Sequence, residues 1–257
     1  LLNVVSERIN SYNDLWFVKQ IKDVLDANKI RADLFIPCLL DGQADRRFNK
    51  NESANLRLTL EFINNLRFDK VTIFHPHNAE VVEALVDNVE IKSNIDFVRE
   101  VFIDIIGHFT PTDNLIMMSP DAGAFKWITK LADQLEFPGE VYGASKSRSW
   151  KDGKSVLTQV VDRQDFGGKD ILVVDDICIY GGSAIGLAKI LKTRNVGKLY
   201  FAASHMTVKS PNPELFELYD KVYTTNSKYD EYLNQFGVSV NSEKLKVCQL
   251  PELKQEA

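Results

Sequence analysis

Two neighbouring carboxylates and a pair of glycines lie close together in the chain, and this pattern favours sugar phosphate chemistry. Asp175 and Asp176 follow an apolar run, and Gly181-Gly182-Ser183 comes a few residues later. Adjacent carboxylates can accept hydrogen bonds from a vicinal diol or hold a hydrated Mg²⁺. Glycines let the backbone approach a ligand closely, and the free N–H groups of a helix N-terminus bind phosphate. We therefore expect a ribose phosphate here, and the alternative is a solvated strand end before an ordinary turn.

A buried strand and a helix are needed to position these groups. Ile171–Val174 are consecutive apolar β-formers, which is typical of a strand buried in a parallel sheet. From Ile185 the apolar residues recur at helical spacing, so a helix follows the loop, and Ser183 is expected to cap it. The same order of strand, loop and helix recurs along the chain, which indicates an α/β fold.

The other elements are predicted from the same hydrophobic spacing, and Asn13-Asp14 is expected to cap the first helix. The remaining expected strands are 1–5, 32–40, 71–74, 115–118, 140–144, 156–161, 198–203, 222–225 and 245–248. The remaining expected helices are 15–27, 54–65, 78–85, 97–106, 125–135 and 214–218. A polar, proline-bearing stretch at 109–113 is expected to connect two similar units, residues 1–110 and 111–257.

Length and composition limit the classes of protein. The 257 residues suffice for one large or two small α/β domains. A net charge of −5 gives no indication of nucleic acid or an anionic membrane as partner. Cys38, Cys178 and Cys248 lack metal-ligand spacing, so unpaired thiols in a reduced, cytoplasmic setting are expected. No membrane-spanning run or signal-peptide pattern is visible, and because the sequence opens at Leu1 inside a strand we expect the start of the first unit to be missing.

Polar groups also follow other predicted strands, at the edge where α/β proteins bind ligands. Arg46 and Arg47 lie in a loop that is either a solvated turn or a phosphate clamp. His75-Pro76-His77 ends a strand, and its histidines are either structural or ligand-binding. Asp121 lies among small residues at a strand-to-helix turn. The basic stretch 145–154 has no hydrophobic period, and it is either a solvated loop or a mobile lid that carries cations over a phosphate site.

Together these motifs resemble the ribose-phosphate pyrophosphokinase family, the PRPP synthetases. Residues 171–186 are similar to the ribose-phosphate loop, Val-Asp-Asp-x-x-x-Thr-Gly-Gly-Thr in outline, which type I phosphoribosyltransferases share. Residues 36–47 are similar to Ile-Pro-Tyr-x-x-Tyr-x-Arg-Gln-Asp-Arg. His77 falls on Asp-x-His, residues 119–123 on Ser-Pro-Asp-x-Gly-Gly, and Lys146-x-Arg148 on the Lys-x-Arg of a mobile catalytic loop. The motifs occur in the family's order over nearly the whole chain.

The resemblance implies an α/β fold of two phosphoribosyltransferase-like units, each a mainly parallel sheet flanked by helices. It also implies ATP as co-substrate and Mg²⁺ as cofactor. The anomeric hydroxyl of ribose 5-phosphate attacks the β-phosphorus of ATP, and AMP leaves. Such transfers depend on positioning and charge neutralisation. The implied partners are small molecules, with no nucleic acid and no membrane, and the chain is expected to form a homo-oligomer because relatives commonly do.

The resemblance also assigns roles to individual residues of this chain. The catalytic residues are Lys146, Arg148 and His77, and the metal ligands are His77, Asp121 and Asp175. The ATP-binding residues are Asp45, Arg46 and His77. The acceptor is bound by Asp175, Asp176, Tyr180, Gly181, Gly182 and Ser183, where the two carboxylates contact the ribose hydroxyls directly or through a second metal.

Departures from the family pattern bear on the acceptor. They are Ile179, Tyr180 and Ser183 in the loop, Gln43 and Ala44 on the nucleotide side, and His75 in place of an aspartate. Loss of a carboxylate and a small hydroxyl makes the 5-phosphate pocket more apolar and adds an aromatic ring. We hypothesise an acceptor whose 5-phosphate carries a further group, such as ADP-ribose, with Tyr180 stacking on it or hydrogen-bonding to it.

Three classes of protein fit the motifs, and a diphosphokinase fits best. A phosphoribosyltransferase that consumes PRPP needs a nucleobase-recognising hood and no ATP site, and Arg46 and His77 argue against it. A non-catalytic regulatory relative is suggested by the substitutions at Gln43, Ala44 and Ile179. Retention of Lys146-x-Arg148 together with the metal ligands argues against that class.

Overall fold

The computed structural model describes residues 3–6, 8–47, 49–107, 114–151, 154–230 and 243–253, without the side chains of residues 3, 146–151 and 154–158. The chain forms two compact units. The first comprises residues 1–94, 226–230 and 249–257, and the second comprises residues 95–225 and 231–248. This division differs from the expected boundary at residue 110, because helix α4 (Ile95–Ile106) packs its apolar face into the core of the second unit.

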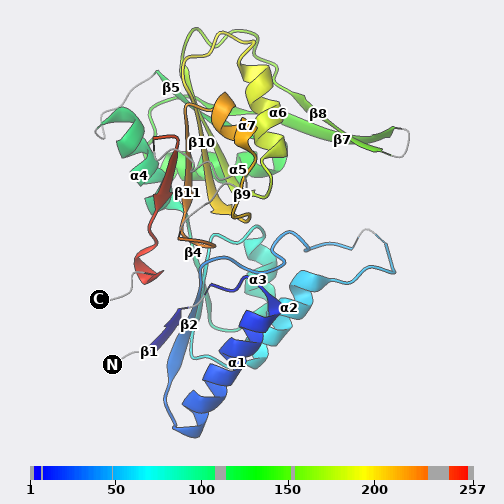
Figure 1. Ribbon diagram of the computed structural model, residues 1–257, viewed down its shortest axis with the longest axis vertical. Helices are drawn as coiled ribbons and strands as arrows, with labels where there is room; N and C mark the ends of the chain where they lie inside the picture. The colour runs from blue at the N-terminus through cyan, green and yellow to red at the C-terminus, as the bar shows by residue number, and fades with distance from the viewer. Residues whose placement is uncertain are drawn as a thin grey trace. The chain divides into compact units, whose positions relative to one another are not determined.

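The first unit is a four-stranded parallel sheet in the order β1-β2-β3-β4 (Figure 1). Its strands are β1 (Asn3–Ser6), β2 (Ala32–Ile36), β3 (Val71–Phe74) and β4 (Val89–Lys92). Its helices are α1 (Tyr12–Ala27), α2 (Asn55–Asn65), α3 (Ala79–Leu85) and the short 3₁₀ helix η1 (Pro251–Leu253). Helix α2 forms where apolar residues recur at helical spacing, and its buried face joins Leu34 and Ile36 of β2 in one core.

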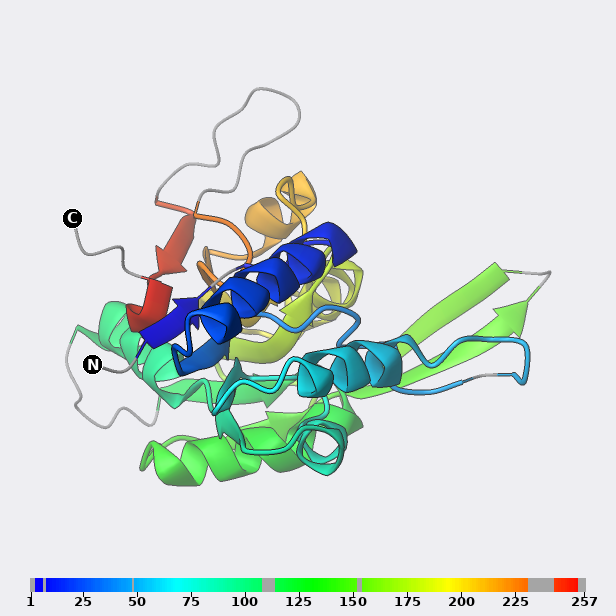
Figure 2. The ribbon, with the colours of Figure 1, turned by 90° about the horizontal axis from the view of Figure 1, so that it is seen from below.

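The second unit contains a six-stranded parallel sheet in the order β12-β11-β10-β9-β5-β6. The central strand β9 (Asp170–Cys178) lies between β10 (Leu199–Met206) and β5 (Leu115–Ser119). The outer strands are β6 (Val141–Gly143), β11 (Lys221–Thr225) and β12 (Leu245–Cys248). Strands β7 (Ser145–Lys151) and β8 (Lys154–Val160) form an antiparallel ribbon that extends away from this sheet (Figures 1 and 2).

Helices cover both faces of the six-stranded sheet. On one face, α4 and α5 (Ala122–Gln134) share a core with Leu172 and Val174 of β9. The helices α6 (Gly182–Leu191) and α7 (Pro213–Leu218) lie on the opposite side of the sheet from α5 (Figure 2). Tyr219, directly after α7, packs on Phe201 of β10 and donates a hydrogen bond to the carbonyl of Ala184 in α6. Tyr219 thereby links β10 to α6.

The predicted class, α/β with two parallel sheets flanked by helices, is confirmed. Strand β4 was not predicted, because it is short and half-exposed and carries no apolar run. The segment predicted as a polar loop at 145–154 forms strand β7 and the first residue of β8, where backbone pairing replaces a hydrophobic pattern. The strand predicted at 32–40 ends at Ile36, because Pro37 has no N–H to donate to a neighbouring strand.

The N-cap of α1 differs from the predicted one. Helix α1 begins at Tyr12, and its N-cap is Ser11, whose side chain forms a capping box with Asp14. The expectation that Asn13-Asp14 caps this helix is therefore wrong, since both residues lie in its first turn. Cys38, Cys178 and Cys248 are all buried, and they form no disulfide within the described part of the chain. Among the described residues, no helix combines the length and the apolar composition that crossing a bilayer requires.

Candidate functional site

The two adjacent carboxylates lie within β9, which continues to Cys178 and is longer than the predicted 171–174. Asp175 is in register with Ala203 of β10. The Asp176 side chain is buried and that of Asp175 is half-buried. The Asp176 backbone N–H donates a hydrogen bond to Asp175 Oδ1 at 2.9 Å. Both carboxylates are thus fixed on an ordered, hydrogen-bonded part of the sheet.

The electrostatics of this strand end favour a cation or several hydroxyl donors. Burial raises the pKa of Asp175 well above its ordinary value, and the negative charge of the neighbouring Asp176 raises it further. The charge of Asp121 has the same effect on the Asp175 pKa. A divalent cation reduces the repulsion between neighbouring carboxylates. The carboxylate oxygens at this strand end are therefore suitable ligands for Mg²⁺.

The loop after β9 is turned by Gly181. This residue has φ of 79°, a left-handed conformation that favours glycine, and it is the N-cap of α6. Its carbonyl accepts a hydrogen bond from Ile185 N at 2.8 Å. Gly182 and Ser183 are the first residues of the helix, so the expectation that Ser183 is the cap is wrong. The first N–H groups of a helix have no intrahelical acceptor, so this turn can bind an anion.

The two unusual residues of the loop are exposed. Ile179 is 42 % exposed and Tyr180 is 69 % exposed. They lie between the carboxylates and the glycine turn in the sequence, next to both halves of the predicted acceptor site. A large apolar side chain and an aromatic ring are therefore accessible to a ligand at this loop.

Asp121 stabilises the start of helix α5 in the second unit. It is the N-cap of α5, and its Oδ1 accepts a hydrogen bond from Ala124 N at 3.0 Å. The Ser119 hydroxyl donates to the Asp121 carbonyl at 2.5 Å, which fixes the turn between β5 and α5. One carboxylate oxygen thus holds the helix, and its charge reaches Asp175 on the neighbouring strand.

The predicted catalytic pair lies on β7. The structure describes the backbone of Lys146 and Arg148, and their side chains are outside the described part of the chain. Lys146 is paired with Gln159 of β8, and Arg148 is paired with Leu157. The two positions lie near the base of the ribbon, next to its start at Ser145.

The predicted ATP-binding residues belong to the first unit. Asp45 is largely buried and accepts a hydrogen bond from the Asn78 amide at 2.9 Å, and it lies 3.6 Å from the Arg46 guanidinium. The Arg46 side chain is 80 % exposed, and His77 is also exposed. The structure therefore brings the loop after β2 and the turn after β3 together through Asp45 and Asn78. Asn78, which also caps α3, was missed in the sequence, although an asparagine directly before a helix is a typical N-cap.

A further polar network anchors the loop after β2. Asp41, which has φ of 59°, accepts hydrogen bonds from the Tyr12 hydroxyl at 2.7 Å and the Thr59 hydroxyl at 2.8 Å. The hydrogen bond with Asp41 raises the pKa of Tyr12. These contacts tie the start of the loop to α1 and α2.

The predicted metal ligands are divided between the units. His77 is in the first unit, and Asp121 and Asp175 are in the second. Within the described residues, no group of three or more His, Cys, Asp and Glu side chains is arranged to hold a metal ion. Of the three predicted ligands, Asp121 and Asp175 belong to the same unit.

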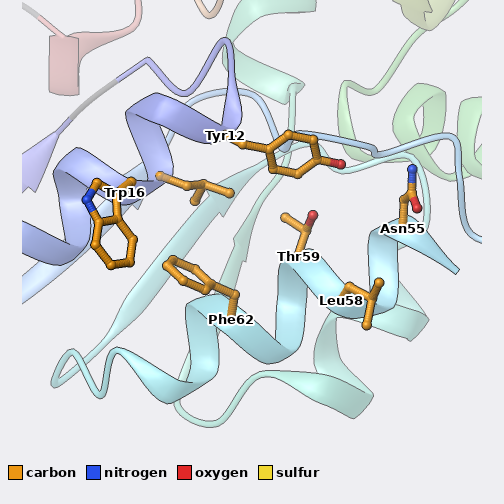
Figure 3. Close-up of a pocket in the computed structure, with 7 residues that line it drawn as sticks. Tyr12, Trp16, Asn55, Leu58, Thr59 and Phe62 are labelled. Carbon is orange, nitrogen blue, oxygen red and sulfur yellow. The ribbon is translucent and has the colours of Figure 1, made fainter. Parts of the chain in front are cut away.

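A hollow of about 290 Å³ lies between α1 and α2 in the first unit (Figure 3). Its lining includes the aromatic rings of Tyr12, Trp16 and Phe62, with Thr59 at one side. None of the predicted site residues contributes to its lining. Mostly apolar walls and half-exposed aromatic rings distinguish this hollow from the charged edge that carries the predicted site.

The family model for the phosphoribosyl transferase domain matches residues 85–242, which is more than half of the chain. The chain belongs to the phosphoribosyl transferase domain family. The match includes Asp121, the β7–β8 ribbon and the whole Asp175 to Ser183 stretch.

Curated relatives of this phosphoribosyl transferase family member are ribose-phosphate pyrophosphokinases, which confirms the resemblance seen in the motifs. The one from Sulfolobus acidocaldarius is 26 % identical over 75 % of this chain and 62 % of its own length. The one from Chlorobaculum tepidum is 26 % identical over 81 % of this chain and 64 % of its own length. The chain thus spans less than two thirds of these relatives.

A solved structure has the same fold. Phosphoribosylpyrophosphate synthetase from Mycobacterium smegmatis superposes with a TM-score of 0.75 and is 19 % identical. The likeness covers 96 % of this chain and 76 % of that protein. At this identity the likeness supports the fold of both units and does not by itself assign an activity.

Proposed function

We propose that this protein is an ATP-dependent diphosphokinase that transfers the β,γ-diphosphate of ATP to the anomeric hydroxyl of a ribose bearing a 5-phosphate. The observation that carries the proposal is the pair Asp175 and Asp176, fixed on β9 a few residues before the Gly181 turn and the N-terminus of α6. This arrangement offers acceptors for two ribose hydroxyls and donors for a phosphate. The similarity to ribose-phosphate pyrophosphokinases supports the choice of a diphosphate transfer.

The proposed reaction forms one bond and breaks one. The anomeric oxygen bonds to the β-phosphorus, the bond between that phosphorus and the α,β-bridging oxygen breaks, and AMP leaves with the bridging oxygen. The proton of the anomeric hydroxyl is lost to solvent or to a nearby base. Catalysis then rests on alignment of the reactants and on neutralising charge on the diphosphate.

In this proposal each group of residues has one task. Asp175 and Asp176 orient the ribose hydroxyls, and the turn Gly181-Gly182-Ser183 holds the 5-phosphate. Lys146 and Arg148, two residues apart and hence on one face of the β7–β8 ribbon, neutralise the transferring diphosphate. On the nucleotide side, Asp45, Arg46 and His77 contact ATP, and the hydrogen bond from Asn78 to Asp45 supports that loop.

Mg²⁺ is proposed as the cofactor. Asp175 and Asp121, with His77, would hold it, and the raised pKa of Asp175 beside other carboxylates agrees with a site built for a cation. The ion would neutralise charge on the triphosphate. We also propose that the chain acts as a homo-oligomer, to be tested by light scattering.

The identity of the acceptor is proposed from Ile179 and Tyr180. Both side chains are accessible at the loop that would hold the 5-phosphate. An acceptor whose 5-phosphate continues into a second group, such as ADP-ribose, would place that group against the Tyr180 ring. Ribose 5-phosphate alone would leave this apolar surface unused.

The experiment follows AMP release from Mg²⁺–ATP with ribose 5-phosphate, with ADP-ribose and without acceptor. AMP that depends on an acceptor supports the diphosphokinase, and faster release with ADP-ribose supports the larger acceptor. Release only with ribose 5-phosphate contradicts the larger acceptor and keeps the reaction. Absence of AMP with either acceptor contradicts the proposed reaction, and a test for pyrophosphate release from PRPP and nucleobases then follows.

A further inference from the structure

The base of the β7–β8 ribbon contacts helix α6 through one side chain. Gln159 is the β8 residue paired with Lys146 of β7. Its carboxamide lies against Gly186 in α6: a Cβ on residue 186 would lie 2.4 Å from Gln159 Oε1. A larger residue at position 186 would therefore require the end of the Gln159 side chain to move. The contact joins the ribbon to the helix whose first turn carries Gly181-Gly182-Ser183.

The same carboxamide has a second unusual property. Its Nε2 atom is buried, and it has no hydrogen-bond partner within the part of the chain that the structure describes. Buried polar atoms in folded proteins nearly always have a partner. The Gln159 side chain thus occupies this contact although its Nε2 donor forms no hydrogen bond with a described residue.

Both partners of the contact lower stability. A glycine inside a helix is less favourable than alanine, and a buried donor without an acceptor loses its hydration. Gly186 lies in the middle of α6, where an alanine would suit the helix better. Neighbouring residues that are each unfavourable for local stability are typical of functional positions.

We propose that Gln159 is a positioning residue for the diphosphate transfer. By seating its carboxamide on Gly186, it fixes the base of the β7–β8 ribbon against α6. This sets the position of residue 146 relative to the 5-phosphate turn, about one helical turn before Gly186. The inference rests on the proposed function for its catalytic part, and the contact between ribbon and helix stands independently of it.

The test uses Gly186→Ala, Gln159→Ala and the double variant in the full chain. Gly186→Ala introduces the Cβ that displaces the carboxamide, and alanine favours the helix, so this variant is expected to fold. Each single variant is expected to lower kcat for AMP release at least about tenfold, with KM for ATP changed less than about twofold. In the double variant the two losses should not add, because both remove the same contact.

Hydrogen exchange of the ribbon gives a readout that does not depend on activity. Backbone amides of 145–151 and 154–160 should exchange at least about tenfold faster in each single variant, since the ribbon loses its attachment to α6. Gln164→Ala is the matched control: Gln164 is exposed, and its amide donates a hydrogen bond to the Asp162 carbonyl. It should leave kcat and ribbon exchange unchanged.

The outcomes separate this inference from the proposed function. Unchanged ribbon exchange in both single variants overturns the inference, whatever the activity. Faster exchange with unchanged kcat overturns the positioning role, since the contact would then be only structural. If the wild-type protein releases no AMP with any acceptor, the diphosphokinase proposal fails, and faster ribbon exchange in the variants still supports the attachment of the ribbon to α6.

Discussion

Single residues on β9 carry the chemistry that we propose. Asp175 and Asp176 are adjacent in sequence, and the backbone N–H of one donates to the carboxylate of the other. Burial and the charges of Asp176 and Asp121 raise the pKa of Asp175 above its ordinary value, so a cation or hydroxyl donors placed beside it would stabilise its ionised form.

Lys146 tests the proposed catalytic cation. Lys146→Ala should lower kcat for AMP release by two or more orders of magnitude, since a charge that acts mainly in the transition state is lost. The melting temperature should stay the same. Lys189→Ala is the control, because Lys189 is a half-exposed lysine on α6 whose side chain pairs with Glu214. An unchanged kcat in Lys146→Ala removes this residue from the mechanism.

Tyr180 tests the identity of the acceptor. With its ring 69 % exposed, Tyr180→Ala should leave the fold intact. It should raise KM for ADP-ribose about tenfold, as expected when a stacking or hydrogen-bonding partner is lost, and leave KM for ribose 5-phosphate unchanged. Steady-state kinetics with both acceptors measure this. Equal effects on the two acceptors contradict the idea that Tyr180 recognises the group beyond the 5-phosphate.

At the level of elements, β9 is the scaffold on which the site depends. Leu172 is fully buried and faces α5 in the core of the second unit. Leu172→Ala should lower the free energy of unfolding by about 2–5 kcal/mol, as typical for a leucine truncated in a packed core. Denaturant titration measures it. Leu58→Ala, at a leucine that is 57 % exposed on α2, should change it by less than about 1 kcal/mol.

Helix α4 is joined to the edge of the six-stranded sheet by Asp104. This carboxylate accepts hydrogen bonds from Lys221 and Tyr223 of β11 and from Lys246 of β12. Burial alone would raise the pKa of Asp104, but these hydrogen bonds together lower it below the ordinary value. A lowered pKa in the folded state means that ionised Asp104 stabilises the fold above the ordinary pKa, and that this is lost as the pH falls through the lowered value.

Asp104→Asn therefore has a pH-dependent effect. At pH 7 it should lower the free energy of unfolding by roughly 1–3 kcal/mol, and the difference from wild type should shrink below about pH 5 and vanish in strong acid. Denaturant titrations at several pH values measure the trend. The control is Asp96→Asn, since Asp96 pairs with Arg99 on the exposed face of the same helix. A difference that is constant with pH contradicts the assigned role of the charge.

The sequence predicted most elements because their hydrophobic periods are strong. Strand β3 and helix α2 have nearly the predicted bounds, since each is covered on its apolar side by the same core. Strand β7 was missed because a two-stranded ribbon is held by backbone pairing, which leaves no apolar pattern. The Gln159 contact was also missed, because a glycine in a helix and a distant glutamine give no joint signal until the chain is folded.

At the scale of the whole molecule, the predicted site residues are distributed over two units. The family motifs predict which residues form the site, and the structure shows which unit contains each of them. Asp45 and His77 belong to the first unit, and the carboxylates with the phosphate turn belong to the second. The boundary between the two units differs from the predicted one, because α4 packs on the second sheet through contacts between residues that are distant in sequence.

The most direct test of diphosphate transfer is to identify the products of the reaction. Phosphorus NMR of the protein with Mg²⁺–ATP and ADP-ribose should show AMP and a diphosphate on the anomeric carbon forming in equal amounts. Replacing ATP by an analogue with a non-cleavable α,β-bridge should abolish both signals. Formation of ADP in place of AMP, or AMP without a diphosphorylated ribose, would contradict transfer of a diphosphate to a ribose held by Asp175 and Asp176.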